Sequence, residues 1–308
     1  MKINRNIKFL ASVLVSVLIL LLIYRKVDFG QLKDILTSVS ALHFSIYILL
    51  FIPQIALAAF RWRYILSRIS NYPVSYLKSF QMVVGSYSAN LIIPAKMGEV
   101  VRVFWVDKSK SKYKPFALVI FEKMWDILVV YLIFYIAFIF VQFHSEKFRE
   151  AFYIFSAINA GAVMAIILFA LLKKKIPLAG NNKMSEILNS IREFWHESKS
   201  DFPVVFIWSI VLWIVQVSQF YFMFRAFNVI LPVDLVFSGS ALSVLAGAVI
   251  ISIGGVGPRD ATIIWFFASL VSKEILVSVG IISVLRIVVP AIVGLPFFIK
   301  LSVQKQQK

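Results

Sequence analysis

The sequence predicts an all-α polytopic membrane protein with a single transmembrane domain over residues 1–308. Composition is the first reason, because 60% of the residues are hydrophobic and only 15% are charged, whereas about a quarter of the residues of a soluble domain are charged. Mean hydropathy is +0.87. The second reason is that several apolar runs reach the length of about 20 residues that a helix needs to cross the hydrocarbon core.

Six apolar runs are predicted to cross the membrane completely. They cover residues 7–24, 42–60, 116–141, 151–172, 202–224 and 275–299. The first run follows a basic start, as a signal peptide does, but it has no small-residue cleavage site and continues into Arg25 and Lys26. We therefore expect it to be retained as the first span.

Two further apolar segments are interrupted near their middles. Residues 79–106 are broken at "PAKMGE" and residues 235–272 at "GGVGPRD". Each segment is either two crossings joined by a short loop or a re-entrant hairpin of two half-helices. With a cytoplasmic amino terminus and two re-entrant hairpins, 22 Lys and Arg residues fall on the cytoplasmic side and 8 outside. Because cytoplasmic loops are enriched in Lys and Arg, the charge count favours the hairpins, with both termini cytoplasmic.

The order of elements occurs twice along the chain: span, span, broken hairpin, span. The two half-repeats are residues 1–141 and 151–299, and residues 173–201 form a cytoplasmic interfacial linker between spans. Because the first half starts in the cytoplasm and the second starts outside, the halves are predicted to be an inverted repeat. Transporters with inverted repeats place their substrate at the interface between the repeats.

Charged residues inside these apolar segments are the candidate functional residues, because a charge at membrane depth is costly unless it faces protein, a partner charge or water. Glu122 and Asp126 are spaced i, i+4 and share one helix face. Three glycines next to Arg259 free backbone N–H groups at a helix start, where an anion is favoured. The candidate substrate-binding residues are Glu99, Arg102, Glu122, Asp126, Gly254, Gly255, Gly257, Arg259 and Arg286, with Lys96 and Asp260 as secondary members.

Other interpretations of these residues remain open at this point. Lys96 and Arg102 have the length to snorkel to lipid headgroups, and Lys123, one residue off the Glu122 face, is expected to do so or to anchor the helix. Buried ion pairs that fix helix registry are the alternative role for Glu99, Arg259 and Arg286.

Several motifs resemble the transmembrane region of lysylphosphatidylglycerol synthases and their free-standing flippase-like relatives. They are "FRW" at 60–62, "NLIIPAKMGEVVR" at 90–102, "FEKMWD" at 121–126, "GGVGPRDA" at 254–261, and Arg286 with Gly294. The resemblance implies a lipid translocator with re-entrant elements. Some members of the family carry a cytosolic domain that aminoacylates phosphatidylglycerol, and we expect this chain, ending at "KLSVQKQQK", to stand alone without it. Lys123 and Asp260 differ from the family's usual Arg and Glu.

The sequence therefore predicts a bacterial or archaeal plasma-membrane translocator that moves a polar-headed lipid between leaflets. Arg259, Arg286 and the "GGVG" backbone would receive a lipid phosphate, while Glu99, Glu122 and Asp126 would balance charge or bind an amine or a proton. The partners expected are anionic, aminoacylated or polyprenyl-linked lipids. A membrane-embedded lipid-modifying enzyme with Glu122 and Asp126 as an acid–base pair, and a non-transporting accessory subunit, are the alternatives.

Composition also limits cofactors and partners. The net charge of +17 is expected to attract anionic lipid headgroups and to fix the membrane topology. Nucleic-acid binding is not expected, because the chain has no basic soluble domain. The absence of cysteine excludes disulfides and thiolate metal sites, and His43, His144 and His196 are too scattered for a metal cluster. No P-loop is present, so we expect no cofactor and no ATP-driven step.

Overall fold

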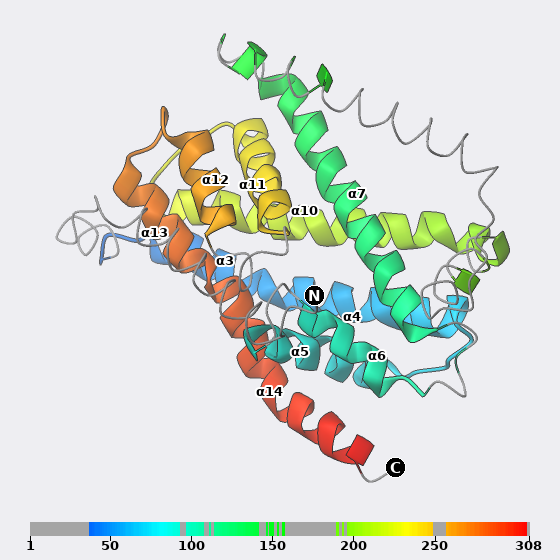
Figure 1. Cartoon of the computed structure of the whole chain (residues 1–308). Helices are drawn as coiled ribbons and strands as arrows, with labels where there is room; N and C mark the ends of the chain where they lie inside the picture. Colours follow the sequence, from blue (N-terminus) through cyan, green and yellow to red (C-terminus); the bar gives the residue numbers. More distant parts are fainter. Residues whose placement is uncertain are drawn as a thin grey trace, which may run out of the picture.

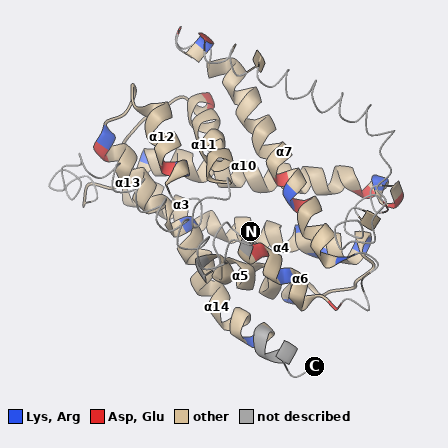
Figure 2. Cartoon of the chain, viewed as in Figure 1, with Lys and Arg blue, Asp and Glu red and all other residues tan. Residues whose placement is uncertain are grey.

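The computed structural model describes residues 37–92, 97–107, 114–141, 196–248 and 257–306, together with a few positions between 111 and 193. Within these ranges every regular element is a helix (Figure 1). The long helices are largely free of charged side chains, and basic and acidic residues occur together on helix α7 (Figure 2). This distribution is that of an all-helical membrane protein with charged residues held in its interior.

Four of the six predicted spans are confirmed as helices long and apolar enough to cross a membrane. They are Ala41–Ile69, Pro115–Val141, Lys199–Ala226 and Lys273–Leu301. The predicted span 7–24, the predicted span 151–172 except for residues 153, 156 and 157, and residues 173–188 of the linker lie outside the described residues.

The span predicted at 42–60 continues further than expected. It consists of α3 (Ala41–Leu49), α4 (Phe51–Tyr64) and a π-helical turn η1 (Ile65–Ile69). Pro53 explains the break between α3 and α4, because its ring clashes with the carbonyl four residues earlier. Arg61, one residue beyond the predicted end at 60, therefore lies within this helix and not after it, with 3% of its surface exposed.

The first broken segment folds back on itself. It contains α5 (Tyr76–Ile92), the 3-10 turn η2 (Met97–Val101) and the short helix α6 (Arg102–Trp105). Gly98 packs against the backbone of Ala89 and Asn90, and a Cβ at Gly85 would lie 3.1 Å from the Trp105 ring. Positions equally far before and after the break are therefore neighbours, as in an antiparallel hairpin.

The second broken segment is also a hairpin, formed by α11 (Val233–Gly247) and α12 (Pro258–Phe267). The two helices pack side by side, and a Cβ at Gly239 would come within 2.5 Å of the Phe267 ring. Residues 93–96 and 249–256 at the two breaks lie outside the described residues. The two hairpins are thus present in the fold, and their re-entrant position in a membrane stays a prediction.

Each hairpin packs against the last span of the other half of the chain. α5 of the first half runs beside α14 (Leu285–Gln306), and α11 of the second half runs beside α7 (Pro115–Val141) (Figure 1). Ser88 on α5 donates a 2.7 Å hydrogen bond to the carbonyl of Ala291 on α14. Gly294 permits this approach, because a Cβ there would overlap the backbone of Val84. The two halves therefore interlock instead of forming separate units.

The second spans of the two halves also pair. α10 (Phe202–Ala226) packs along α3 and α4, and Gln219 donates a 2.9 Å hydrogen bond to Gln54 across this interface. Two hydrophobic clusters fill the interior, one containing Phe134, Phe220 and Phe267 and the other containing Trp62 and Phe121. α13 (Lys273–Ser283) precedes α14 and completes the last span.

Candidate functional site

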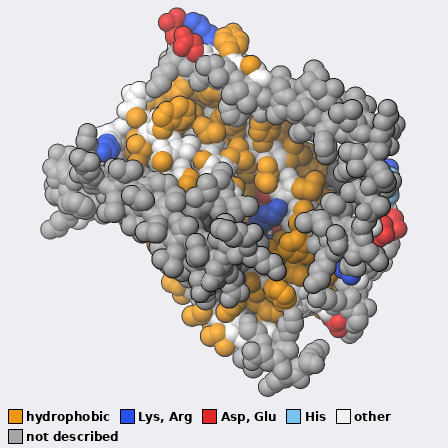
Figure 3. All heavy atoms as spheres, viewed as in Figure 1, with side chains coloured by type: hydrophobic (Ala, Val, Ile, Leu, Met, Phe, Trp, Pro, Cys, Tyr) orange, Lys and Arg blue, Asp and Glu red, His pale blue; other side chains and the backbone are white. Residues whose placement is uncertain are grey.

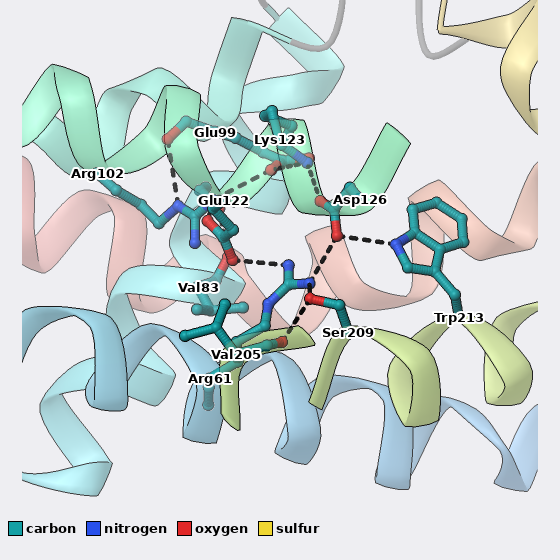
Figure 4. A network of polar contacts seen from close by, with 12 residues as sticks. Arg61, Val83, Glu99, Arg102, Glu122, Lys123, Asp126, Val205, Ser209 and Trp213 are labelled. Carbon is teal, nitrogen blue, oxygen red and sulfur yellow. Dashed lines mark hydrogen bonds and ion pairs between the residues drawn. The ribbon is translucent and has the colours of Figure 1, made fainter. Parts of the chain in front are cut away.

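Arg61 of α4 is the centre of a buried ion-pair network (Figure 4). Its Nη1 atom lies 2.6 Å from Oδ1 of Asp126, and its Nη2 atom lies 2.8 Å from Oε1 of Glu122. Both carboxylates come from one face of α7, as the i, i+4 spacing predicted. Because Arg61 and Glu122 are 3% and 2% exposed, the two helices are joined by charges that are almost entirely removed from solvent.

Arg102 of α6 connects the first hairpin to the same carboxylates. Its Nη2 atom lies 2.7 Å from Oε2 of Glu122 and 3.1 Å from Oε2 of Glu99. Its guanidinium also lies 4.4 Å above the Trp62 ring, which adds a cation–π contact. Arg102 is 3% exposed, so its charge is held inside the protein and does not snorkel to the headgroups.

Lys123 closes the network on its outer side. Its Nζ atom lies 2.5 Å from Oε2 of Glu99 and 3.0 Å from Oδ2 of Asp126. The Lys123 side chain is 39% exposed, the largest exposure of any basic member. On the face shown in Figure 3, basic atoms lie in a hollow bordered by hydrophobic side chains. The expectation that Lys123 only snorkels or anchors is therefore corrected, because both of its contacts are with buried or half-buried carboxylates.

α10 supplies two neutral partners to the network. Nη1 of Arg61 donates a 2.8 Å hydrogen bond to Oγ of Ser209, and Nε1 of Trp213 donates one of the same length to Oδ1 of Asp126. Ser209 and Trp213 are one helical turn apart and therefore share a face. We name the six charged residues the α7 network: Arg61, Glu99, Arg102, Glu122, Lys123 and Asp126.

Arg259 lies in a second group at the start of α12. Its Nε and Nη2 atoms lie 2.9 and 2.8 Å from Oδ1 of Asp260. Oδ2 of Asp260 accepts a 3.3 Å hydrogen bond from the N–H of Gly257, which has a φ of 98° that favours glycine. Asp260 therefore caps the helix with one carboxylate oxygen and pairs with Arg259 through the other. Arg259 is 5% exposed.

Arg286 of α14 belongs with Arg259. Its Nη2 atom donates a 3.1 Å hydrogen bond to Oε1 of Gln216, and its guanidinium lies 4.4 Å from the centre of the Phe220 ring. Among the described residues no carboxylate lies within ion-pair distance of Arg286. We call Arg259 and Arg286 the arginine pair.

The structure thus divides the predicted site in two. The three carboxylates and Arg102 converge as expected, but they are neutralised by Arg61, which the site prediction had left out, and not by Arg259 and Arg286. The signal that could have found Arg61 is an arginine in "FRW" within an apolar run of helical length. Lys96, Gly254 and Gly255 lie outside the described residues. No arrangement of His, Asp and Glu suited to a metal ion occurs in the described part of the chain.

An apolar cavity of about 740 Å³ lies between α7, α10 and α11. Val129 and Ile133 line it from α7, and Ile210 and Ile214 line it from α10. The cavity is therefore bounded mainly by hydrocarbon side chains, with Asp234 of α11 as the charged residue in its lining.

The comparison with protein families decides where the chain belongs. Residues 9–294 match the family model described as "Lysylphosphatidylglycerol synthase TM region". The chain belongs to this family. The match contains every residue of the α7 network and the arginine pair, and it supports a multi-pass membrane protein related to lipid handling. Comparisons with curated proteins and with solved structures give no significant match.

Proposed function

We propose that the protein is a flippase-like lipid translocator, which moves a polar-headed phospholipid or lipid-linked substrate between the leaflets of a bacterial or archaeal plasma membrane. The observation that carries the proposal is the exchange of hairpins between the two halves: α5 packs on α14, and α11 packs on α7. Rocking one half against the other around such an interface is a common way to give a site alternating access to the two sides.

The positions of the charges support this function. Arg102 follows the break in the first hairpin and Arg259 follows the break in the second. Irregular backbone and buried charge at membrane depth are tolerated where they line a cavity or face protein. The polar headgroup would pass through this charged interior while the acyl chains remain in the bilayer.

The apolar cavity supports a lipid rather than a water-soluble substrate. Its lining comes from α7, α10 and α11 and is almost entirely hydrocarbon. Ile136 and Phe140 of its lining are each more than half exposed, which is the form expected of a surface in contact with hydrocarbon. An acyl chain of the transported lipid would lie in this cavity.

The alternative of an acid–base enzyme is weakened by the ion pairs. A general base needs a carboxylate that is free to take a proton within hydrogen-bond reach of the substrate. Glu122 and Asp126 are both held by Arg61 at 2.8 Å or less, so neither is free in this arrangement.

Reconstitution into liposomes tests the proposal. The purified protein is expected to move at least one labelled phospholipid between leaflets without changing its chemical identity. Lipid sidedness is measured by quenching of the label, and lipid identity by mass spectrometry of the extracted lipids. Conversion of a lipid to a new species would indicate the enzyme, whereas neither movement nor conversion of any polar-headed lipid would favour the accessory subunit.

A further inference from the structure

The charges of the α7 network come from three parts of the fold. η2 and α6, which together we call the hairpin tip, contribute one acid and one base. α4 contributes one base, and α7 contributes two acids and one base. These residues are Glu99 and Arg102 in the hairpin tip, Arg61 in α4, and Glu122, Lys123 and Asp126 in α7. Of the three parts, the hairpin tip alone brings no net charge to the network.

This division of charge determines where the network can come apart. Moving α4 or α7 away would separate a positive part from a negative part, and a buried charge without its countercharge is costly in an apolar interior. Moving the hairpin tip away leaves two neutral parts. The boundary between the hairpin tip on one side and α4 with α7 on the other is therefore the plane along which separation costs least. We call this boundary the seam.

Every carboxylate keeps a hydrogen-bonded base on its own side of the seam. In the hairpin tip, Nη2 of Arg102 donates to Oε2 of Glu99 at 3.1 Å, and its Nε donates to the Glu99 carbonyl at 3.2 Å. On the other side, Arg61 donates to Glu122 at 2.8 Å and to Asp126 at 2.6 Å. Opening the seam therefore leaves no carboxylate of the network without a base, which is the condition that makes breaking a buried ion pair expensive.

The charged contacts that cross the seam differ in their access to water. Among the described residues, Arg102 lies 2.7 Å from Glu122 and over the Trp62 ring, and Lys123 lies 2.5 Å from Glu99. The side chains of Lys123 and Glu99 are 39% and 17% exposed, whereas those of Arg102 and Glu122 are 3% and 2% exposed. Water can replace the partners of a partly exposed pair at little cost. The Lys123–Glu99 contact is therefore the one that opens first.

The two hairpins are held to α7 in different ways. Among the described residues, α11 of the second hairpin packs extensively on α7, whereas the hairpin tip meets α7 at few positions. The first hairpin instead rests on α4 and α14 through α5, and Gly98 packs the tip onto Ala89 and Asn90 of α5. Ion pairs, and not an extended apolar interface, therefore hold the hairpin tip to α7.

The seam lies near one end of α7. Glu122 is the eighth residue of Pro115–Val141, so at about 1.5 Å per residue it lies about 10 Å from the start of the helix. The sequence predicts that the residues before α7 are cytoplasmic. An opening at the seam would thus lead from that side of the membrane to the buried charges, along a path lined by polar groups.

From this division of charge we infer that the hairpin tip is a gate. It moves away from α4 and α7 along the seam and so admits the polar headgroup from the side of the membrane on which α7 begins. In the structure the gate is closed by the Arg102–Glu122 and Lys123–Glu99 contacts. The inference rests on the proposed function for the identity of what passes, whereas the opening itself follows from the ion pairs.

Cysteine labelling tests the opening without requiring transport, because the chain has no cysteine of its own. Val103 of the hairpin tip is 7% exposed, so a water-soluble thiol reagent reaches Val103→Cys when the tip moves. Lys123→Gln removes a partly exposed contact across the seam and should raise the labelling rate by about twofold to fivefold. Lys123→Arg keeps the charge and should leave the rate unchanged.

A second reporter separates opening of the seam from general loosening of the protein. Val236 lies on α11 of the second hairpin and is fully buried. The labelling rate of Val236→Cys should not respond to Lys123→Gln, because the seam does not include α11.

A reversible crosslink tests whether the headgroup passes through the seam. Glu99→Cys and Lys123→Cys are combined and bridged with a reducible bifunctional thiol reagent in liposomes. Bridging should abolish movement of labelled phospholipid, and reduction should restore it, which also shows that the variant is folded. The matched control is Glu146→Cys with Arg149→Cys, an exposed pair three residues apart, where bridging should leave movement unchanged.

Each contrary result has a defined meaning. If Lys123→Gln leaves labelling of Val103→Cys unchanged, or raises that of Val236→Cys equally, the network is a fixed support and the gate is overturned. Full lipid movement after bridging of Glu99→Cys and Lys123→Cys would show that the headgroup takes another route. If labelling responds as expected but the wild type moves no lipid, the opening stands and the proposed translocation fails.

Discussion

The α7 network and the arginine pair contain the same types of side chain in the same apolar interior, but they differ in how their charge is balanced. In the network, Arg61 is neutralised by Glu122 and Asp126 at 2.8 and 2.6 Å. In the pair, Arg286 donates to a neutral glutamine at 3.1 Å, and no carboxylate of the described residues lies within ion-pair distance of it. The difference teaches that a buried arginine is part of the structure where its countercharge is internal, and a candidate for binding where the countercharge is missing.

Removing Arg61 should give the largest effect, because it leaves Glu122 and Asp126 with less positive charge in a dry interior. We expect Arg61→Gln to lower the free energy of unfolding by about 3–5 kcal/mol, the usual cost of breaking a buried ion pair from one side. Arg63→Gln is the matched control, since Arg63 lies two residues away, is exposed and contacts only the Val74 carbonyl among described residues.

The stability of the Arg61→Gln and Arg63→Gln variants is measured by equilibrium unfolding in mixed micelles of mild detergent and dodecyl sulfate, followed by circular dichroism. The control should change stability by less than about 0.5 kcal/mol. Equal losses for the two arginines would show that the network does not hold the helices together.

A double-mutant cycle should show that the two groups are energetically separate. Arg61→Gln combined with Asp126→Asn should give a coupling energy of about 1–3 kcal/mol, because the two side chains are in direct contact. Asp126→Asn combined with Arg286→Gln should be additive within about 0.5 kcal/mol, because these two side chains share no partner among the described residues. Strong coupling in the second cycle would mean that the predicted single site exists after all.

Much of the fold could be predicted from local sequence. The four spans follow from uninterrupted apolar runs, and both hairpins follow from Pro and Gly beside charges, since these residues break helices wherever they occur in such runs. The pairing of Glu122 with Asp126 on one face follows from helical periodicity alone. Each of these features depends on residues that are close together in the chain.

The partners of the charges could not be predicted in the same way. Arg61 reaches Asp126 across 65 positions of sequence, and the contact depends on how α4, α7 and α10 pack. Hydropathy ended the second span at "FRWRY", which placed Arg61 at the membrane surface, whereas the helix continues to Ile69. A helix end and a buried ion pair look alike in sequence when the countercharge lies on a distant helix.

Replacing Lys123 tests whether the most exposed basic residue of the α7 network contributes as much to stability as the buried Arg61. Its side chain is 39% exposed. When Lys123 is replaced, Glu99 still pairs with Arg102 and Asp126 still pairs with Arg61. We therefore expect Lys123→Gln to cost less than about 1 kcal/mol, as partly exposed pairs do, and Lys123→Arg to be nearly neutral. Unfolding in mixed micelles is again the measurement, and a loss as large as that of Arg61→Gln would place Lys123 among the buried structural charges.

Arg286→Gln should have the smallest effect on stability. The substitution loses the Gln216 hydrogen bond and the contact with Phe220, each worth about 1 kcal/mol. It also removes a half-buried charge that has no carboxylate within ion-pair distance among the described residues, which stabilises the folded protein by a similar amount. In lipid-free detergent, the free energy of unfolding should therefore change by less than about 1 kcal/mol in either direction. A loss in lipid-free detergent as large as that of Arg61→Gln would show that the charge of Arg286 is compensated inside the protein, and the contrast between the two groups would disappear.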